Sequence, residues 1–127
     1  MLAGKEMVAT IAAKDLATAR KFYEGTLGLK VEDDTGTEAH TYRSAGTRLI
    51  VYRSQFAGTN KATAATWAVG DDIEQVVGDL KNKGEKFEHY DFPGTTLQGD
   101  VHVMGKTKAA WLKDPDGNIL SLVNGES

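Results

Sequence analysis

Apolar and polar positions follow the same order twice along this chain of 127 residues. Residues 7–13 form an apolar, partly β-branched run that is typical of a buried strand. Asp15 follows as a helix cap, and the apolar residues after it recur at helical spacing. Gly28 supplies the left-handed residue at which such a helix ends. The first stretch of the chain therefore predicts a strand followed by an amphipathic helix.

Three shorter strands are expected after this helix, over residues 29–32, 39–44 and 48–52. A tight turn at Ala45-Gly46 separates the last two strands, and residues 48–52 have the strongest strand character because they are mostly β-branched or aromatic. A segment at about residues 55–62 then lacks a periodic pattern, and we predict a linker there.

The second half repeats this order at a constant offset of 56 residues. Residues 8–15 correspond to residues 64–71, and Gly28 returns as Gly84. Two copies of one supersecondary unit predict a pseudo-symmetric fold. Each copy has the order βαβββ, so the fold class is α+β with two tandem modules.

The second copy begins with a strand over residues 63–69, and Asp72 with Gln75 predicts a capping box for its helix. Residues 86–90 predict a short strand, whereas the glycine-rich stretch over residues 92–106 has no regular pattern. The last two strands are predicted over residues 108–113 and 119–123, joined by a turn at Asp114-Pro115-Asp116-Gly117-Asn118.

Composition restricts the classes of function. The length of 127 residues suits a single domain, with module 1 at about residues 5–54 and module 2 at about residues 63–124. A net charge of -3 argues against a nucleic-acid partner, and no apolar run reaches the roughly 18 residues of a membrane-spanning helix. The chain has no cysteine, which excludes disulfides and zinc–thiolate sites. We expect a cytoplasmic protein without membrane or nucleic-acid partners.

Two sequence motifs lie at matching places in this double pattern. The first consists of Asp15, Leu16, Phe22, Tyr23, Leu27, Gly28 and Leu29, and the second is Asp-Pro-Asp-Gly-Asn at residues 114–118. Together with the repeat they resemble the vicinal oxygen chelate superfamily, which includes glyoxalase I, extradiol dioxygenases, fosfomycin-resistance enzymes and bleomycin-resistance binding proteins. The resemblance implies a curved mixed eight-stranded sheet around a concave cavity, with both helices on the convex face. It also implies a homodimer.

The resemblance further implies where a metal ion would bind. Metal-bearing members carry one ligand on the first strand of each module and one on the last strand. The corresponding positions of this chain hold Val8, Ile50, Ala64 and Ser121. Three alkyl groups and one hydroxyl cannot replace the imidazole and carboxylate ligands that divalent metals require. We therefore expect no metal and no other cofactor.

Displaced metal ligands are the alternative. The histidines form no His-x-x-x-His pair, and His89 lies in an exposed, charged strand. His40 and His102 border the expected cavity, so they are the candidates for a displaced pair. The resemblance implies that the late irregular stretch forms the lip of the cavity, and we place His102 and Trp111 there. For Trp111 a packing role is favoured over stacking on a ligand.

Strand periodicity assigns the remaining side chains to the two faces of the sheet. The helix side is expected to contain Ala9, Ile11, Leu49, Val51, Ala65, Trp67, Leu120 and Leu122. The ligand cavity on the opposite face is expected to contain Val8, Thr10, Arg48, Ile50, Tyr52, Ala64, Thr66 and Ser121, with Ala12, Ala68, Ile119 and Val123 beside them. A mostly apolar cup with a few polar groups is typical of a small-molecule pocket.

The faces of three residues depend on the hairpin at Ala45-Gly46. A two-residue loop would pair Arg43 with Arg48 and turn both toward the cup, whereas a three-residue loop would turn His40 and Tyr42 there instead. The pattern of residues leaves both loops open.

Three functions are compatible with these residues. The unsuited metal positions favour a metal-free protein that binds a small aromatic or anionic molecule in the cup, with Arg48 as counter-charge and Tyr52 orienting the ligand. The second function is that of an enzyme of the same superfamily with a non-standard active site, for which His40, His102, Tyr52 and Arg48 are candidates. The third is an assembly module that has lost its ligand.

Overall fold

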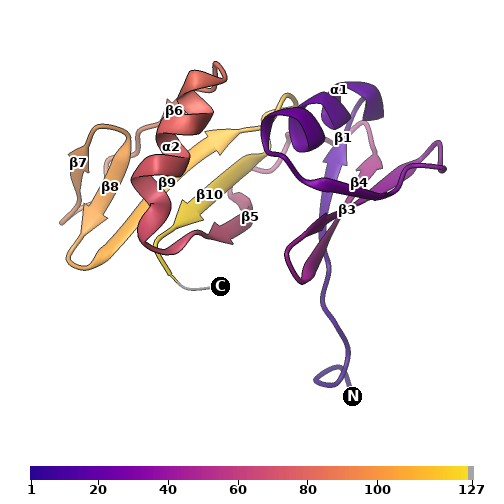
Figure 1. Cartoon of the computed structure of the whole chain (residues 1–127), viewed down its shortest axis with the longest axis horizontal. Coiled ribbons are helices and arrows are strands. Elements are labelled where there is room, and N and C mark those ends of the chain that lie inside the picture. Colours follow the sequence, from indigo (N-terminus) through magenta and orange to yellow (C-terminus); the bar gives the residue numbers. More distant parts are fainter. Residues whose placement is uncertain (126–127) are drawn as a thin grey trace. The chain divides into compact units, whose positions relative to one another are not determined.

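The structure, a computed structural model, describes residues 1–125. The chain forms two compact units, the first from Met1 to Thr59 and the second beginning at Asn60. The division between them falls inside the segment predicted as the linker. Each unit starts with a strand and a helix and continues into antiparallel strands (Figure 1).

Unit 1 is a four-stranded sheet with one helix. Its elements are β1 (Ala9–Ala13), α1 (Leu16–Arg20), β2 (Lys30–Asp33), β3 (Ala39–Ser44) and β4 (Thr47–Arg53). The strand order is β1-β4-β3-β2, in which β1 and β4 run parallel and the other neighbours antiparallel. This is the βαβββ module that the sequence predicts.

The helix of unit 1 begins and ends where the sequence predicts. The Asp15 carboxylate accepts a hydrogen bond from the Ala17 N–H at 3.0 Å, which satisfies one of the free donors at the start of α1. The helix widens into a π-helical segment over Lys21–Thr26. It ends at Gly28, whose φ of 76° needs a residue without a side chain, and the Leu29 N–H then donates to the Tyr23 carbonyl.

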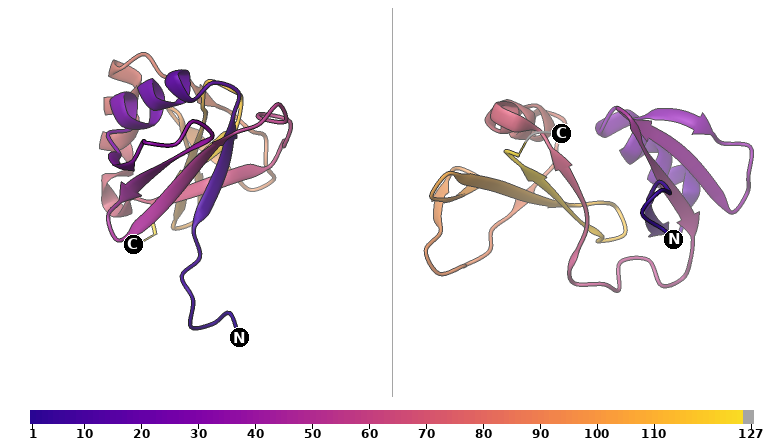
Figure 2. Two further views of the ribbon diagram at one scale, coloured as in Figure 1. Left: turned by 90° about the vertical axis from the view of Figure 1, so that its right-hand side faces the viewer. Right: turned by 90° about the horizontal axis from the view of Figure 1, so that it is seen from below.

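The core of unit 1 lies between the helix and one face of the sheet (Figure 2). On the helix, Leu16, Ala19, Phe22 and Tyr23 are buried. On the sheet, Ile11, Leu49 and Val51 are buried while Ile50 is only half-buried, so the predicted alternation is confirmed. Ala9 differs, because it lies at the open start of β1 and is exposed.

Unit 2 contains more strands than predicted. Its elements are β5 (Thr63–Ala68), α2 (Ile73–Asn82), β6 (Phe87–Glu88), β7 (Thr96–Gln98), β8 (Val101–Met104), β9 (Thr107–Lys113) and β10 (Ile119–Val123). The sheet has the order β5-β10-β9-β8-β7, and β6 pairs with β9. As in unit 1, the first and last strands run parallel.

The stretch over residues 92–106, predicted to be irregular, holds the β7–β8 hairpin and the turn into β9. Gln98 pairs with Val101, and Met104 pairs with Thr107, so each turn has two residues. Gly99 and Gly105 take φ values of 64° and 59° in these turns, which such short hairpin loops require. The glycines therefore mark tight turns between strands. The alternation of apolar and polar residues that predicts a strand is missing from β7, because all of its residues are exposed.

Helix α2 presents the predicted apolar stripe to the sheet, with Ile73, Val77 and Leu80 buried. The predicted capping box is wrong. Gly70–Asp72 form a short 3-10 turn before the helix, so the Asp72 backbone is already turned and its side chain makes no capping bond.

The motif at residues 114–118 is a closed turn that joins β9 to β10. The Asp114 carboxylate accepts hydrogen bonds from the N–H groups of Asp116 and Asn118 at 3.0 and 2.8 Å. Its second oxygen accepts from the Asn118 side-chain amide at 2.8 Å. Gly117 has a φ of 93°, which explains the glycine at this place. The motif thus has a structural role, and it holds β10 beside β9.

The α+β class with two tandem βαβββ modules is confirmed, and both sheets are open and curved. The described residues contain ten strands in place of eight, because β7 and β8 are additional. They also contain no helix that is long and apolar enough to cross a membrane.

The assignment of faces can be tested with two neighbouring residues of β4. Leu49→Ala removes a side chain that is 3% exposed and should cost about 2–5 kcal/mol of unfolding free energy. Ile50→Ala, on the opposite face, should cost only about 1 kcal/mol. Urea unfolding measures both, and equal losses would contradict the assignment.

Candidate ligand-binding site

The hairpin between β3 and β4 decides which side chains of unit 1 face away from the helix. Ser44 pairs with Thr47, so the loop is the two-residue turn Ala45-Gly46, and Arg43 lies opposite Arg48. His40 pairs with Val51 and therefore shares the helix side with it. The first of the two loop alternatives is thus correct, so Arg43 and Arg48 face away from the helix, whereas His40 and Tyr42 share its side.

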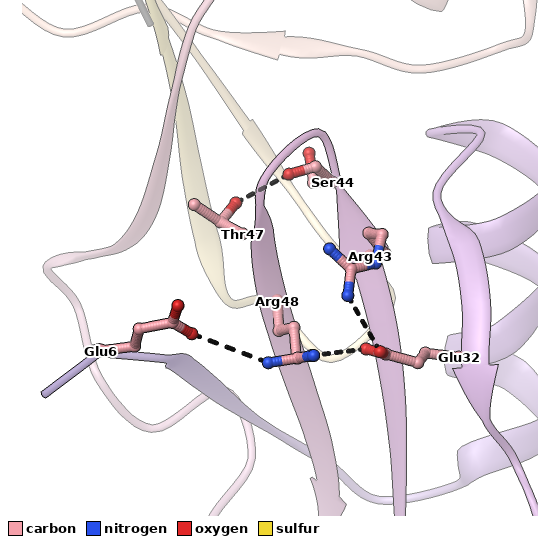
Figure 3. Close-up of polar contacts among 6 residues, drawn as sticks. All are labelled: Glu6, Glu32, Arg43, Ser44, Thr47 and Arg48. Atoms are coloured by element: carbon pink, nitrogen blue, oxygen red, sulfur yellow. Dashed lines mark hydrogen bonds and ion pairs between the residues drawn. The ribbon is translucent and has the colours of Figure 1, made fainter.

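Arg43 and Arg48 are held together by one carboxylate. One carboxylate oxygen of Glu32 on β2 accepts a hydrogen bond from Arg48 Nε at 2.7 Å, and the other accepts one from Arg43 Nη2 at 3.0 Å. Glu6 approaches Arg48 from the other side at 3.7 Å, but it is 85% exposed. Figure 3 shows Glu32 between the two guanidinium groups. The two opposed cations, which would repel each other if alone, are therefore linked by Glu32.

These contacts change the pKa values of Glu32 and Arg48 in the expected direction. The hydrogen bonds from Arg48 and then Arg43 lower the pKa of Glu32. The bond to Glu32 raises the pKa of Arg48. All three side chains are about a third or more exposed, so solvent screens the pairs. The charge of Arg48 is therefore already compensated by Glu32, which weakens the case for Arg48 as the counter-charge of a ligand.

The other predicted cavity residues of unit 1 line an open surface. Thr10 pairs with Ile50 and Ala12 with Tyr52, all on the face away from the helix. Val8 is half-buried and precedes β1. Tyr52 borders a wide hollow of about 810 Å³ whose other lining residues are mostly polar: Lys14, Glu38, Ala39, Arg53, Ser54 and Gln55.

Unit 2 differs because its face away from the helix is apolar and partly covered. Ser121 is buried, and its hydroxyl lies 2.7 Å from that of Thr66. Ser121 pairs with Trp111 on β9, and the Trp111 indole N–H donates to the Thr63 hydroxyl at 3.2 Å. The polar groups at this place thus bond to one another.

A β-bulge brings Thr63 to this face. Ile119 pairs with Thr63 and Leu120 with Ala65, so Ala64 has no partner on β10. Strict alternation along the strand predicts that Ala64 faces the cavity. Because Ala64 is the extra residue of the bulge, Thr63 lies on that face instead. No feature of the sequence marks this bulge.

Three aromatic side chains form a pocket in unit 2. The hollow has a volume of about 310 Å³ and is lined by Lys61, Ala62, Thr63, Tyr90, Phe92, Trp111 and Ile119. The Trp111 ring meets Tyr90 at 5.3 Å and Phe92 at 5.7 Å between centroids. Of the seven lining residues, only Lys61 is charged. An apolar, aromatic wall with one cation suits a flat molecule that carries a polar or anionic group.

His102 lies behind this aromatic wall. Its side chain is 2% exposed, and its ring lies 4.9 Å from that of Trp111. The Tyr90 backbone N–H donates to His102 Nε2 at 2.9 Å, which fixes the segment that carries Tyr90 and Phe92. The predicted neighbours of the cavity lip, His102 and Trp111, are therefore adjacent, but His102 is buried beneath it.

His89 has a separate, structural partner. Its Nε2 lies 2.7 Å from Asp100, and Lys81 lies 2.7 Å from the other oxygen of the same carboxylate. Hydrogen bonds from Lys81 and His89 lower the pKa of Asp100. This cluster joins α2 to the loop between β7 and β8 and carries no ligand chemistry of its own.

The donor set does not fit a metal ion. Val8, Ile50 and Ala64 have no donor atom, and the Ser121 hydroxyl is engaged by Thr66. Over residues 1–125, no group of three or more His, Cys, Asp or Glu side chains could hold a metal. His102 packs against the rings of Tyr90, Phe92 and Trp111, and His40 pairs with Val51 in the other unit.

The sequence also matches a known family. The model of the Glyoxalase/Bleomycin resistance protein/Dioxygenase superfamily matches residues 7–122. The chain belongs to this superfamily. The resemblance inferred from the two motifs is thereby confirmed. No curated protein matches the chain significantly.

Solved structures of this superfamily share the fold. The glyoxalase/bleomycin resistance protein/dioxygenase from Alicyclobacillus acidocaldarius is 20% identical, with a TM-score of 0.70 over 94% of this chain and 90% of its own. The FosX fosfomycin resistance protein from Listeria monocytogenes, complexed with Mn(II) and sulfate, is 13% identical, with a TM-score of 0.71 over 99% and 93%. Lactoylglutathione lyase from Agrobacterium tumefaciens is 16% identical, with a TM-score of 0.70 over 94% and 92%.

Sequence reasoning did not find two walls of the pocket. Tyr90 ends the strand predicted over residues 86–90, Phe92 begins the stretch without a regular pattern, and Lys61 lies in the predicted linker. The spacing of the two aromatic residues was the one available signal, since residues two apart in an extended chain share a face.

The Glu32 network predicts a pH-dependent stability. Because the pKa of Glu32 is lowered in the folded state, its ion pairs stabilise the fold above about pH 4.5, the ordinary pKa of a glutamate. This contribution is lost as the pH falls through the lower pKa of the folded state. Glu32→Gln should therefore lower the urea midpoint at pH 7, and the difference from the natural protein should shrink below about pH 4.5.

Glu6→Gln is the matched control, because Glu6 touches the same arginine from a fully solvated position. It should leave the midpoint unchanged. A Glu32→Gln protein as stable as the natural one at pH 7 would show that the network contributes nothing.

Proposed function

We propose that this protein reversibly binds a small aromatic molecule, including one with an anionic group, in the apolar pocket of unit 2 without a metal ion. The observation that carries the proposal is the pocket formed by Tyr90, Phe92 and Trp111 with Lys61 at its rim. Flat ligands gain burial and edge or face contacts from such walls. Lys61 supplies the counter-charge that Arg48 was expected to provide.

The donor set supports binding without a metal. Every other superfamily function that depends on a bound cation would need ligands at Val8, Ile50, Ala64 and Ser121, and none of these side chains is suited to the task. The proposal therefore relies on shape and aromatic contacts.

An enzyme with a non-standard active site is less well supported. In unit 1, His40 lies on the helix side of the sheet, whereas Arg48 and Tyr52 lie on the other side. Arg48 is bonded to Glu32, and His102 accepts a backbone N–H. None of these residues forms a nucleophile–base pair with another. The homodimer and the cytoplasmic location stay predictions.

The experiment that tests this function is a thermal-shift screen of metabolites and antibiotics. We expect flat aromatic compounds to raise the melting temperature and to be recovered chemically unchanged after long incubation. Recovery of a converted product would establish an enzyme, and a broad screen without hits would favour the assembly module.

Phe92 should contribute to this binding. Phe92→Ala removes one aromatic contact, which is worth about 0.5–1.5 kcal/mol, so the affinity for a screen hit should fall about two- to tenfold. Phe56→Ala is the matched control, because Phe56 is an exposed phenylalanine of unit 1 and lines no part of the pocket. Isothermal titration measures both variants. Equal affinities of the two variants would place the ligand elsewhere.

A further inference from the structure

One ring nitrogen of His102 is buried without a hydrogen-bond partner. Nε2 accepts the Tyr90 N–H and thus uses its lone pair, so a neutral ring carries its proton on Nδ1. Among residues 1–125, no group accepts a hydrogen bond from this Nδ1. The side chain is 2% exposed, so bulk water does not satisfy the donor either.

Tyr90, which lines the pocket, also carries a buried polar atom without a partner. Four buried side-chain atoms of the described residues have no partner, and three of them belong to Tyr90, Thr95 and His102. Leaving a buried donor unpaired costs about 1–3 kcal/mol, so native proteins rarely do so without a reason. A ligand that supplies the missing acceptor is such a reason.

The unpaired donor lies next to the aromatic walls. The His102 ring is 4.9 Å from Trp111, 6.2 Å from Tyr90 and 6.3 Å from Phe92, measured between ring centroids. Phe92 is 41% exposed and is the most exposed ring of the four.

We propose that the ligand of this pocket is a planar aromatic molecule bearing an acceptor oxygen, a carbonyl or a carboxylate, that takes the hydrogen bond from His102 Nδ1. This inference rests on the proposed function and names the ligand class. Tyr90 keeps the imidazole in the tautomer that donates from Nδ1, and Phe92 moves aside as the ligand enters. Lys61 at the rim adds attraction when the acceptor is a carboxylate.

The consequence is selectivity between flat molecules of similar size. A molecule with the acceptor satisfies the buried donor, whereas one without it leaves the donor unpaired. A hydrogen bond of this kind changes the affinity about fivefold to tenfold. Coumarin, with a ring carbonyl, and naphthalene, without one, are two neutral, fused, flat bicycles that form a suitable pair of probes.

Two variants distinguish the roles of the two ring nitrogens of His102. His102→Gln can place an amide oxygen where Nε2 accepts the Tyr90 N–H, but it has no donor at the position of Nδ1. His102→Asn can place an amide N–H near the position of Nδ1, but it is too short to reach Tyr90. Comparison of the two therefore distinguishes recognition of the ligand from support of the pocket wall.

Isothermal titration of both probes into the natural protein and the two variants tests the proposal. We expect coumarin to bind the natural protein about fivefold to tenfold more tightly than naphthalene. This preference should disappear in His102→Gln and persist in His102→Asn, although His102→Asn should bind both probes more weakly. Melting curves of the unliganded variants check that each is folded.

The other outcomes are distinguishable. Equal affinities of the two probes for the natural protein overturn this inference and leave the proposed function intact. No binding of either probe counts against the aromatic-binding function itself. A preference that survives in His102→Gln, or that is lost in His102→Asn, shows that Nδ1 is not the donor.

A second measurement needs only the natural protein and so does not depend on the folding of variants. In ¹⁵N-labelled protein, Nε2 should show the resonance of an unprotonated nitrogen and Nδ1 that of a protonated one. Coumarin should shift the Nδ1 proton strongly and naphthalene should not. The reverse tautomer, or equal shifts with the two probes, would overturn the proposal.

Discussion

The whole arrangement depends on the alternation of side chains along the parallel first and last strands, which only the bulge at Ala64 interrupts. In each unit these two strands lie side by side, so one set of side chains faces the helix and the other set faces away. In unit 1, Leu49 and Val51 build the core from the first set, and Ile50 belongs to the second. Because the core requires the first set to be apolar, only the second set is free to vary with function.

The two units use this second face in different ways. In unit 1 it carries the charges of Arg43, Arg48 and Glu32, which satisfy one another. In unit 2 it carries the Thr66–Ser121 hydroxyl pair and the aromatic wall at Trp111. A face whose charges are already paired has little to offer a ligand, whereas an apolar hollow gains from filling. The same repeated module thus provides a stabilised surface in one copy and a pocket in the other.

Much of the fold could be predicted from periodicity and from a few backbone-specific residues. The helix limits at Asp15 and Gly28 followed from capping and left-handed geometry, and the two faces of β4 followed from strand periodicity. The β-bulge at Ala64 and the 3-10 turn before α2 could not be predicted, because both depend on tertiary packing. The site was harder to predict. Arg48 lies on the expected face of its sheet, away from the helix, but its pairing with Glu32 joins strands distant in sequence.

Our central proposal is that this protein works without a metal ion, because Val8, Ile50, Ala64 and Ser121 are unsuited to hold one. The most direct test is metal analysis of the protein purified without chelator, together with melting curves in added zinc, nickel or manganese. We predict no stoichiometric metal and an unchanged melting temperature. An ion bound to the folded state at about 100 times its dissociation constant would add about 2.7 kcal/mol, an easily measured shift. One metal per chain, bound through His40 or His102, would contradict the claim.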